Sequence, residues 1–275
     1  MSKYKEVYNL SIKNKEDFWK KVSEDIFWYE KPTKILNTEN PPFYKWFEDG
    51  VTNTCYNALD YHIDNGRGEK IAIIYDSPIT NTQKKITYNE LKDKVAMFAG
   101  ALRKQGVNKK DRVIIYMPMI PEAVIAMLAC GRIGAVHSVV FGGFAANELA
   151  SRIDDSKAKL IVSASCGYEP GRTVEYKPLL NKAIELAKHK PSKCIIYQRE
   201  KFKAELDSTI DISWEYSLKD VEPANCEKMK GSDYAYILYT SGTTGLPKGI
   251  VRDIAGHIVA LKWTMKNIYN IDQDD

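Results

Sequence analysis

The sequence predicts an α/β fold in which βαβ units form a mostly parallel sheet flanked by helices. Between residues 70 and 198, short runs of β-branched and other apolar residues alternate with segments of helical periodicity, which is typical of strands joined by crossover helices. The runs are apolar throughout, as expected for strands that a parallel sheet buries on both faces. Such sheets bind ligands beyond the carboxyl ends of their strands, so we expect a functional site at that edge.

The expected elements follow one another along the chain. Strands are predicted at 71–75, 113–117, 135–141, 160–164, 194–198 and 236–240. One helix is predicted to start at Thr87, where Thr87 and Glu90 have the spacing of a capping box, and to end near Gly106. Its apolar stripe consists of Leu91, Val95, Phe98 and Leu102. Further helices are predicted at 121–131, 145–154 and 177–189.

Residues 1–60 differ from the rest because they are rich in aromatic residues, are interrupted by prolines and have no strand pattern. Phe18, Trp19, Val22 and Ile26 recur at helical spacing. The following segment 41–47 could lie as an aromatic strap across another surface, or the aromatic side chains could fill a small core of their own. We interpret residues 1–60 as an appendage and expect the main domain to begin at about residue 61.

Composition excludes several classes of protein. The chain has 275 residues, of which 44% are apolar, and its net charge is +4 from 40 basic and 36 acidic residues. This charge is too small and too dispersed to predict a nucleic-acid partner. The longest nearly uncharged stretch, 123–131, is far shorter than the ~20 residues of a membrane span. No signal-peptide core precedes residue 10 and the first arginine is Arg67, so we expect a cytoplasmic protein without a membrane partner.

Neither cysteine nor histidine spacing predicts a metal site. The five cysteines lie far apart without a C-x-x-C pair, and the four histidines lack metal-ligand spacing. We therefore expect reduced, mostly buried thiols. His137 and His257 have no carboxylate or nucleophile at a suggestive spacing, so both are expected to be structural, and no catalytic residue is predicted.

The segment at the end of the strand 236–240 has the composition of a ligand-binding loop. Its hydroxyl residues are Thr240, Ser241, Thr243 and Thr244, its glycines are Gly242, Gly245 and Gly249, and its one cation is Lys248. A loop that wraps a polyphosphate needs close backbone approach, hydrogen-bond donors and a positive charge, and this segment supplies all three. The spacing differs from the G-x-x-x-x-G-K-[ST] loop, which excludes that class of nucleotide-binding protein. The alternative is a flexible turn, although a turn needs neither the lysine nor so many hydroxyls.

These residues also carry a family resemblance. Residues 239–249, YTSGTTGLPKG, resemble the signature phosphate loop of the adenylate-forming acyl-CoA synthetases. Residues 135–144, AVHSVVFGGF, the preceding 116–119, YMPM, and the aromatic amino-terminal segment resemble the short-chain branch of that family, the acetyl- and propionyl-CoA synthetases. The resemblance runs along nearly the whole chain.

The resemblance implies a two-step ligation that uses ATP with Mg²⁺ and coenzyme A. A short-chain carboxylate, acetate or propionate, attacks the α-phosphate of ATP and releases pyrophosphate, and the thiol of coenzyme A then displaces AMP from the acyl-adenylate. By resemblance, the residues that hold the β- and γ-phosphates are Thr240, Ser241, Gly242, Thr243, Thr244, Gly245 and Lys248.

The resemblance places a second site at Glu169–Arg172. The family has two arginines near the phosphates of coenzyme A, and Arg172 matches the second, whereas Glu169 stands in place of the first. This form resembles the propionate-type relatives. Arg172 could instead be a solvated surface charge.

By the same resemblance, Gly143 corresponds to a glycine that approaches the cofactor, or it serves only a tight turn. Ala255 replaces a family glycine and would be strained if that position needs a positive φ.

The resemblance also implies that much of the family's machinery lies beyond Asp275, including the acyl pocket, the magnesium-binding glutamate and the mobile carboxy-terminal domain. We therefore expect 61–275 to be an incomplete adenylation domain without a carboxy-terminal domain. Three interpretations stay open: an amino-terminal portion that is inactive alone, a binding half that complements a separately encoded carboxy-terminal half, or a relic without activity. Whether the chain is itself an enzyme, and whether acetate or propionate is preferred, stay open with them.

Overall fold

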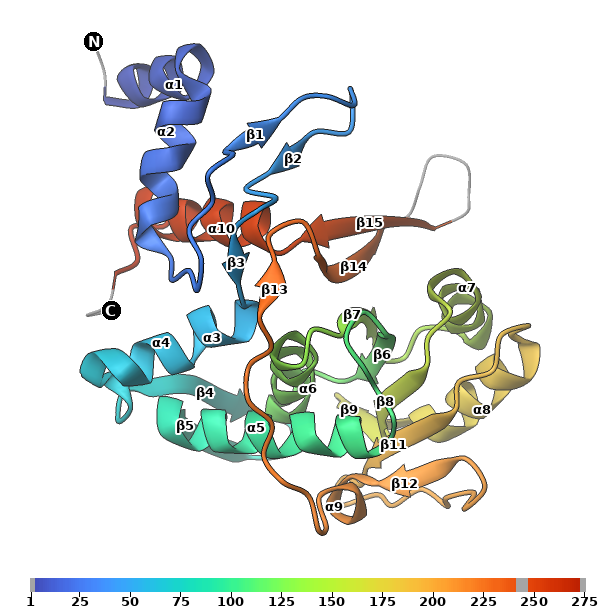
Figure 1. Ribbon diagram of the computed structural model, residues 1–275. Coiled ribbons are helices and arrows are strands. Elements are labelled where there is room, and N and C mark those ends of the chain that lie inside the picture. The colour runs from blue at the N-terminus through green and yellow to red at the C-terminus, as the bar shows by residue number, and fades with distance from the viewer. Residues whose placement is uncertain (1–2, 241–246, 273–275) are drawn as a thin grey trace.

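The computed structural model describes residues 3–240 and 247–272. Its centre is a seven-stranded sheet with the order β12-β11-β8-β6-β7-β14-β15 (Figure 1). The strands are β6 (Arg112–Met117), β7 (Val136–Phe141), β8 (Leu160–Ala164), β11 (Lys193–Tyr197), β12 (Asp211–Ser213), β14 (Tyr234–Thr240) and β15 (Lys248–Asp253). Every neighbouring pair is parallel except β14 and β15. The predicted α/β class with a mostly parallel sheet is confirmed.

Helices cover both faces of this sheet. They are α5 (Tyr88–Lys104), α6 (Pro121–Arg132), α7 (Ala146–Ser156), α8 (Tyr176–Leu186) and the short α9 (Trp214–Ser217). The chain steps from β6 to β7 through α6 and then reverses direction to β8 through α7. Because parallel crossovers share one handedness, this reversal places α6 and α7 on opposite faces. Helix α5 packs beside α6, and α8 packs beside α7.

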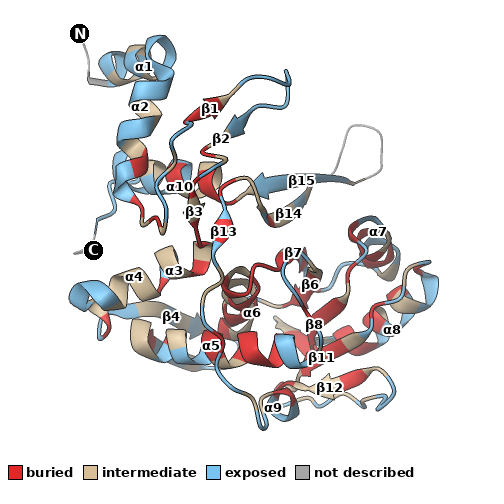
Figure 2. Ribbon diagram, in the orientation of Figure 1, coloured by how far each residue is buried: buried red, intermediate tan, exposed pale blue. Residues whose placement is uncertain are grey.

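The main core lies between the sheet and these helices. Figure 2 shows buried residues concentrated on β6, β8 and β11 and on the inner sides of α5 and α6. The predicted stripe of α5 is buried throughout, with Leu91, Val95, Phe98 and Leu102 each at most 2% exposed. Thr87 caps this helix and forms the predicted capping box with Glu90.

Two predictions in this region need correction. The strand at 71–75 exists as β4 (Ile71–Ser77), but it pairs antiparallel with β5 (Thr82–Thr87) in a separate two-stranded sheet. Helix α8 ends at Leu186 rather than residue 189. The amino group of Lys190 donates to the carbonyls of Ile184 and Ala187, so these groups are satisfied without a further helical turn.

The amino-terminal segment is more regular than predicted. It contains helices α1 (Lys3–Lys13) and α2 (Lys15–Val22), a 3-10 turn at Ser23–Asp25 and helix α3 (Thr54–Ala58). Helix α4 (Asp60–His62) and a π-helical turn at Ile63–Arg67 follow at its boundary with the main domain. The expectation of no strands there is wrong, because β1 (Leu36–Asn37) pairs with β2 (Lys45–Trp46) and β3 (Val51–Thr52) pairs with β13 (Met229–Lys230). These strands are only two residues long, too short to leave a periodic pattern.

The aromatic side chains of this segment pack against α10 (Ala255–Asn267), a helix from the other end of the described chain. Phe18 and Trp19 contact Trp263 edge-on, with ring centroids 6.1 and 6.3 Å apart. A buried cluster joins Ile26, Trp28, Ile35 and Phe47 to Ala255 and Val259. Both sequence interpretations are therefore partly right, since the aromatics form a small core and α10 supplies one wall of it.

No helix among the described residues is both long and apolar enough to cross a bilayer. The longest, α5, has 17 residues and carries charged side chains along its length.

Candidate functional site

Three predicted site positions lie beyond the carboxyl ends of parallel strands. Gly143 follows β7, Arg172 lies in the hairpin that follows β8, and Thr240 ends β14. Strands β7, β8 and β14 run in the same direction, so these positions share one edge of the sheet although they are far apart in sequence. Strands β8 and β14 are three strand spacings apart, about 14 Å. The edge therefore has two separate groups, one around Thr240 and one around Arg172.

The predicted phosphate loop connects two antiparallel strands. Thr240, at the end of β14, is the register partner of Lys248, at the start of β15. Both residues are exposed. The other predicted loop residues, Ser241, Gly242, Thr243, Thr244 and Gly245, lie outside the described residues. The sequence analysis missed β15, because residues 248–253 follow the loop without a turn signal of their own.

A set of side chains from α7 supports the end of β14. The Tyr239 hydroxyl donates to Oδ2 of Asp155 at 2.6 Å. Burial, and then this hydrogen bond to the carboxylate, raises the pKa of Tyr239, so the hydroxyl keeps its proton at neutral pH. The Arg152 guanidinium lies 5.4 Å from the centre of the Tyr239 ring and 5.3 Å from that of Phe144. Arg152 also donates to the Glu148 carboxylate at 2.8 Å, which fixes its direction.

These supporting residues were absent from the prediction. Tyr239 and Asp155 are 84 positions apart, and no sequence pattern near either residue predicts their contact. The Glu148–Arg152 spacing of four residues is a usable signal for a helical ion pair. It does not reveal that the guanidinium lies over a strand that comes 87 positions later.

Gly143 occupies the turn between β7 and α7 with a φ of +94°. Its N–H donates to the Tyr116 hydroxyl at 3.2 Å, and that hydroxyl donates to the Phe144 carbonyl at 2.9 Å. A Cβ on Gly143 would meet nothing nearer than Val174 at 4.0 Å, so conformation rather than crowding favours glycine. Gly142 is different, because a Cβ there would lie 2.4 Å from the Tyr176 hydroxyl. The tight turn considered for Gly143 is therefore present, and the residue is exposed.

Arg172 lies in the hairpin of β9 (Cys166–Glu169) and β10 (Arg172–Glu175). Its Nε and Nη2 atoms both contact Oε2 of Glu169, at 2.7 and 2.6 Å. The Arg172 side chain is 71% exposed, so it is both solvated and paired within its own hairpin. Glu169 thus offsets part of the charge of Arg172.

A hollow of about 280 Å³ lies beside this hairpin, and Thr80, Tyr168, Arg172 and Lys201 contribute to its lining. Thr80 Oγ1 is buried without a hydrogen-bond partner among the described residues. Buried polar atoms usually have partners, so the Thr80 hydroxyl leaves room for a polar group in a hollow whose lining holds Arg172, Lys201 and the Glu169 carboxylate. The sequence analysis did not find Thr80 or Lys201, which reach the hairpin from other loops.

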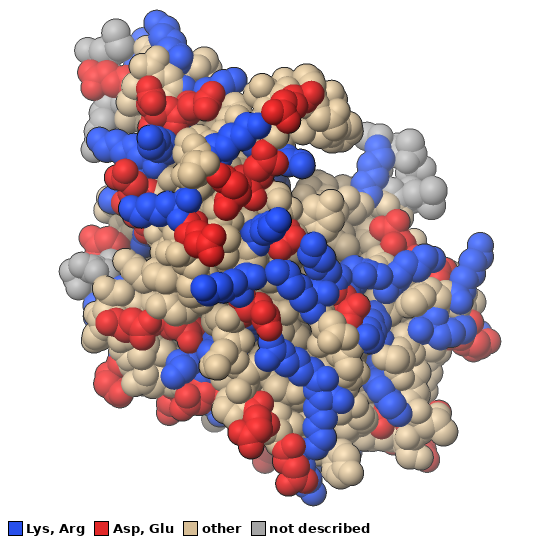
Figure 3. Space-filling view, in the orientation of Figure 1, with Lys and Arg blue, Asp and Glu red and all other residues tan. Residues whose placement is uncertain are grey.

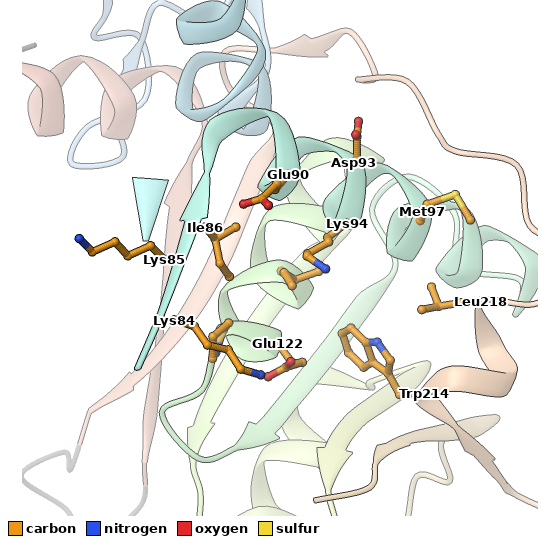
Figure 4. A pocket seen from close by; sticks show the side chains of 12 residues that line it. Lys84, Lys85, Ile86, Glu90, Asp93, Lys94, Met97, Glu122, Trp214 and Leu218 are labelled. Atoms are coloured by element: carbon orange, nitrogen blue, oxygen red, sulfur yellow. The ribbon is translucent and has the colours of Figure 1, made fainter. Parts of the chain in front are cut away.

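A second hollow, of about 560 Å³, lies between β5, α5, α6 and α9 (Figure 4). It has three lysines and three acidic residues in its wall, and none of its described lining residues has a buried, unpartnered side-chain polar atom. In Figure 4, Lys84 and Glu122 extend toward each other, whereas the Asp93 carboxylate points away from the hollow. Trp214 stacks on Phe98 at 3.8 Å between ring centroids. This is a surface depression whose wall carries equal numbers of basic and acidic side chains.

His137 and His257 flank the Tyr236 ring, with centroids 5.5 and 5.0 Å from it. Burial, and then the charge of His257, lowers the pKa of His137 to about 4, so His137 is neutral at pH 7. Both histidines line an apolar hollow of about 710 Å³ together with residues of α6, β14 and α10. Ala255 begins α10 and is not among the residues with positive φ, so the strain considered for it is absent.

Each of the five cysteines is unpaired as a disulfide, and all are buried except Cys226, which is half-buried. The prediction of mostly buried, reduced thiols agrees with this. Cys55 and Cys226, although far apart in sequence, are neighbours in space.

Lys and Arg side chains gather in a band across the middle of the face shown in Figure 3, over the end of α5 and the segment that leads to β13. Arg103 pairs with Glu227 there, and Lys109 and Lys110 contact Asp233 at 3.6 and 3.1 Å. Much of this positive charge is thus offset by acidic partners on the same surface.

The fold is an α/β domain whose candidate residues lie in loops at the carboxyl edge of a mostly parallel sheet. The family model for "AMP-binding enzyme" matches residues 61–275, and the model for "Acetyl-coenzyme A synthetase N-terminus" matches residues 4–58. The chain belongs to the AMP-binding enzyme family.

Named relatives agree with this assignment. The chain is 51% identical over 269 residues to "Acyl-CoA synthetase short-chain family member 3, mitochondrial" of Rattus norvegicus, covering 98% of this chain and 39% of that protein. It is 39% identical over 283 residues to "Acetyl-coenzyme A synthetase" of Xylella fastidiosa, covering 99% of this chain and 43% of that protein. The chain thus spans about two fifths of the length of these relatives.

A solved structure shows the same fold. The "Acetoacetyl-CoA Synthetase from Streptomyces lividans" superimposes with a TM-score of 0.89 at 24% identity, over 98% of this chain and 41% of that one.

Proposed function

We propose that this chain supplies the ATP-phosphate loop and part of the coenzyme A site of an AMP-forming short-chain acyl-CoA synthetase. The observation that carries the proposal is the hairpin β14–β15, which sets the Lys248 cation opposite Thr240 at the carboxyl edge of the sheet. The family membership and the names of the relatives support the same activity.

In the proposed reaction a carboxylate attacks the α-phosphate of ATP, and negative charge moves onto the departing pyrophosphate. The task of this chain is to hold the β- and γ-phosphates while that charge develops. Lys248 would offset the charge, and the Thr240 hydroxyl, with Ser241, Gly242, Thr243, Thr244 and Gly245, would supply donors and close backbone approach. Mg²⁺ would arrive with ATP, and we assign no side chain of this chain as its ligand.

The Arg172 hairpin is proposed to bind phosphates of coenzyme A, whose thiol displaces AMP from the acyl-adenylate. The unpartnered Thr80 hydroxyl and the nearby Lys201 support a polar, anionic ligand there. Glu169 would have to release Arg172 for a phosphate, which weakens this site relative to one with two arginines. Gly143, exposed in its turn, is proposed to let the same ligand approach the backbone. We propose acetate or propionate as the acyl substrate, with the Glu169 form favouring propionate.

Nucleotide binding tests the first part of the proposal. Titration of the full chain with a fluorescent ATP analogue should give saturable binding, and Lys248→Ala should weaken it by about tenfold, corresponding to about 1.4 kcal/mol. Lys21→Ala is the matched control, because Lys21 is an exposed lysine of α2 on the side of the molecule away from the hairpin (Figure 1). Equal affinity in Lys248→Ala and wild type would contradict the proposed loop.

A specific observation favours complementation by a second polypeptide. Leu238, Leu261 and Met265 of β14 and α10 are 44–48% exposed, and all three line the hollow of about 710 Å³. Contiguous exposed apolar surface of this kind marks an interface. We propose that this surface is covered by a polypeptide equivalent to the part of the relatives outside the aligned region. We also propose that residues 1–60 act as an appendage and that residues 61–275 form an incomplete adenylation domain.

Mixing this chain with the remaining part of a relative tests complementation. Pyrophosphate release with ATP and propionate should appear only in the mixture, and acetate should support less. Release by this chain alone would contradict the proposed division of labour. Absence of both release and ATP binding would favour a relic.

We propose the cytosol as the compartment of this protein. Cell fractionation with an antibody to the chain tests this.

A further inference from the structure

Two cysteines that are distant in sequence lie side by side at the junction of the amino-terminal segment and the main domain. Cys55 belongs to α3, and Cys226 lies in the segment between α9 and β13. The two Sγ atoms and a carboxylate oxygen of Asp60 all lie within 4.8 Å of one another. A disulfide needs its sulfurs about 2 Å apart, so the two sulfur atoms would have to move closer together to form one.

The groups around the pair make a bound cation unfavourable. The Arg132 guanidinium donates to both oxygens of Asp60, at 2.7 and 3.0 Å, and its side chain is only 4% exposed. Arg132 Nη1 also contacts the Cys55 Sγ at 3.6 Å. A metal ion would have to displace or face this buried positive charge, so the cluster is not a metal site despite its three possible ligands.

The two thiols differ in access and environment. Cys55 is fully buried, whereas Cys226 is half-buried and follows the exposed Asn225. The hydrogen bond with the Cys55 thiol, and then burial, raises the pKa of Cys226, so its thiolate is scarce at neutral pH and it should react slowly.

We propose that Cys55 and Cys226 form a reversible disulfide when the protein meets a low-molecular-weight disulfide such as oxidised glutathione. The Cys226 thiolate attacks one sulfur of the small disulfide, which forms a mixed disulfide and releases one glutathione thiolate. The Cys55 thiolate then attacks the Cys226 sulfur, which forms the protein disulfide and releases the second thiolate. The two protein thiols lose two electrons and two protons, and the small disulfide gains them as two thiols.

This bond would join α3 to the segment before β13 and close a loop of about 170 residues, which restricts the unfolded chain. It would also tether residues 4–58 to residues 61–275, the two regions that match separate family models. The oxidised protein should therefore be more resistant to heat than the reduced protein, and a thiol reductant should reverse the effect. The inference is independent of the proposed ATP and coenzyme A sites.

Peptide mapping of the native full chain tests the pair directly. The protein is equilibrated in glutathione buffers of rising oxidised fraction, alkylated, and digested with trypsin without reduction. The expected product links peptide 46–67 to peptide 220–228, and the intact oxidised protein has a mass about 2 Da below the reduced form. A glutathione adduct that persists on Cys226 while Cys55 is alkylated after denaturation would overturn the proposal, as would native linkage between other cysteines.

Variants provide a second, internally controlled measurement. Oxidation should raise the melting temperature of wild type and of Cys130→Ala by several degrees, because Cys130 is buried elsewhere in α6. The same treatment should leave Cys226→Ser and Cys55→Ser unchanged. Each variant is compared with its own reduced form, so a general loss of stability does not obscure the result. An equal shift in Cys226→Ser would refute the assignment.

Discussion

Lys248 begins β15 directly opposite Thr240, the last residue of β14, so the hydroxyl- and glycine-rich segment between them starts and ends at one point of the sheet edge. Antiparallel partners of this kind have Cα atoms about 5 Å apart. The strand register, rather than the loop itself, therefore brings the cation next to the first hydroxyl. A slip of one residue would turn Lys248 to the other face of the sheet.

The Tyr239–Asp155 hydrogen bond should hold the end of β14 on α7. Tyr239→Phe removes the bond at 2.6 Å and should lower the free energy of unfolding by about 1 kcal/mol. It should also weaken ATP binding, because Thr240 is the next residue. Urea unfolding and nucleotide titration measure the two effects. Tyr234→Phe is the control, since Tyr234 is on the same strand and 60% exposed; an equal loss in both variants would argue against a specific role for the bond.

The buried Arg132–Asp60 pair should matter far more to stability than the exposed Arg172–Glu169 pair. Asp60→Asn leaves a guanidinium that is 4% exposed without its counterion and should cost about 3 kcal/mol. Glu169→Gln breaks a pair whose side chains are 45% and 71% exposed and should cost less than about 0.5 kcal/mol. Chemical denaturation of both variants checks the difference, and similar costs would mean that the Arg132 site relaxes or admits water.

The Gly142–Gly143 turn allows conformation and crowding to be separated. Gly143→Ala should cost about 1–2 kcal/mol, because an L-residue is strained at a φ of +94° while its Cβ has room. Gly142→Ala should displace Tyr176, whose hydroxyl would lie 2.4 Å from the new Cβ. Near-ultraviolet circular dichroism should change in Gly142→Ala and stay close to wild type in Gly143→Ala. The opposite pattern would contradict this account of the turn.

Mild acid should destabilise the fold in part through His137. The folded pKa is lowered to about 4 from an ordinary value of 6.5, so the unfolded chain takes up a proton first as the pH falls. The stabilisation is complete above the unfolded pKa and is lost as the pH falls from about 6.5 toward 4. Urea midpoints measured over this range should drop more steeply in wild type than in His137→Gln. Parallel slopes would show that His137 titrates normally.

Much of the sheet could be predicted from the sequence because most of its strands are short runs of apolar and β-branched residues. The strands β6, β7, β8, β11 and β14 all lie within two residues of their predicted bounds. The predictions failed where pairing is not encoded nearby. Strand β5 (TQKKIT) is mostly polar, and it forms a strand through its antiparallel pairing with β4. Strand β15 depends on β14 in the same way, and α8 ends early because Lys190 folds back onto its carbonyls.

In the candidate site, too, contiguous motifs could be recognised from the sequence, whereas contacts between distant elements could not. The residue types of the loop, the glycine turn and Arg172 were recognisable in sequence because each motif is contiguous, and their roles as ligand contacts stay predictions. Their support was not recognisable: Asp155 beneath Tyr239, Arg152 over the ring, and Thr80 and Lys201 beside the Arg172 hairpin come from other elements.

The amino-acid order by itself determined the apolar periodicities, the caps and the run of hydroxyls, glycines and lysine, because each of these acts over a few neighbouring residues. Only the tertiary structure decided which distant groups meet: Lys248 with Thr240 in register, Glu169 neutralising Arg172, and Cys55 beside Cys226 with Arg132 between Asp60 and the thiol. The physical reason is that packing and strand pairing are set by the shape and burial of whole elements, which no local spacing specifies.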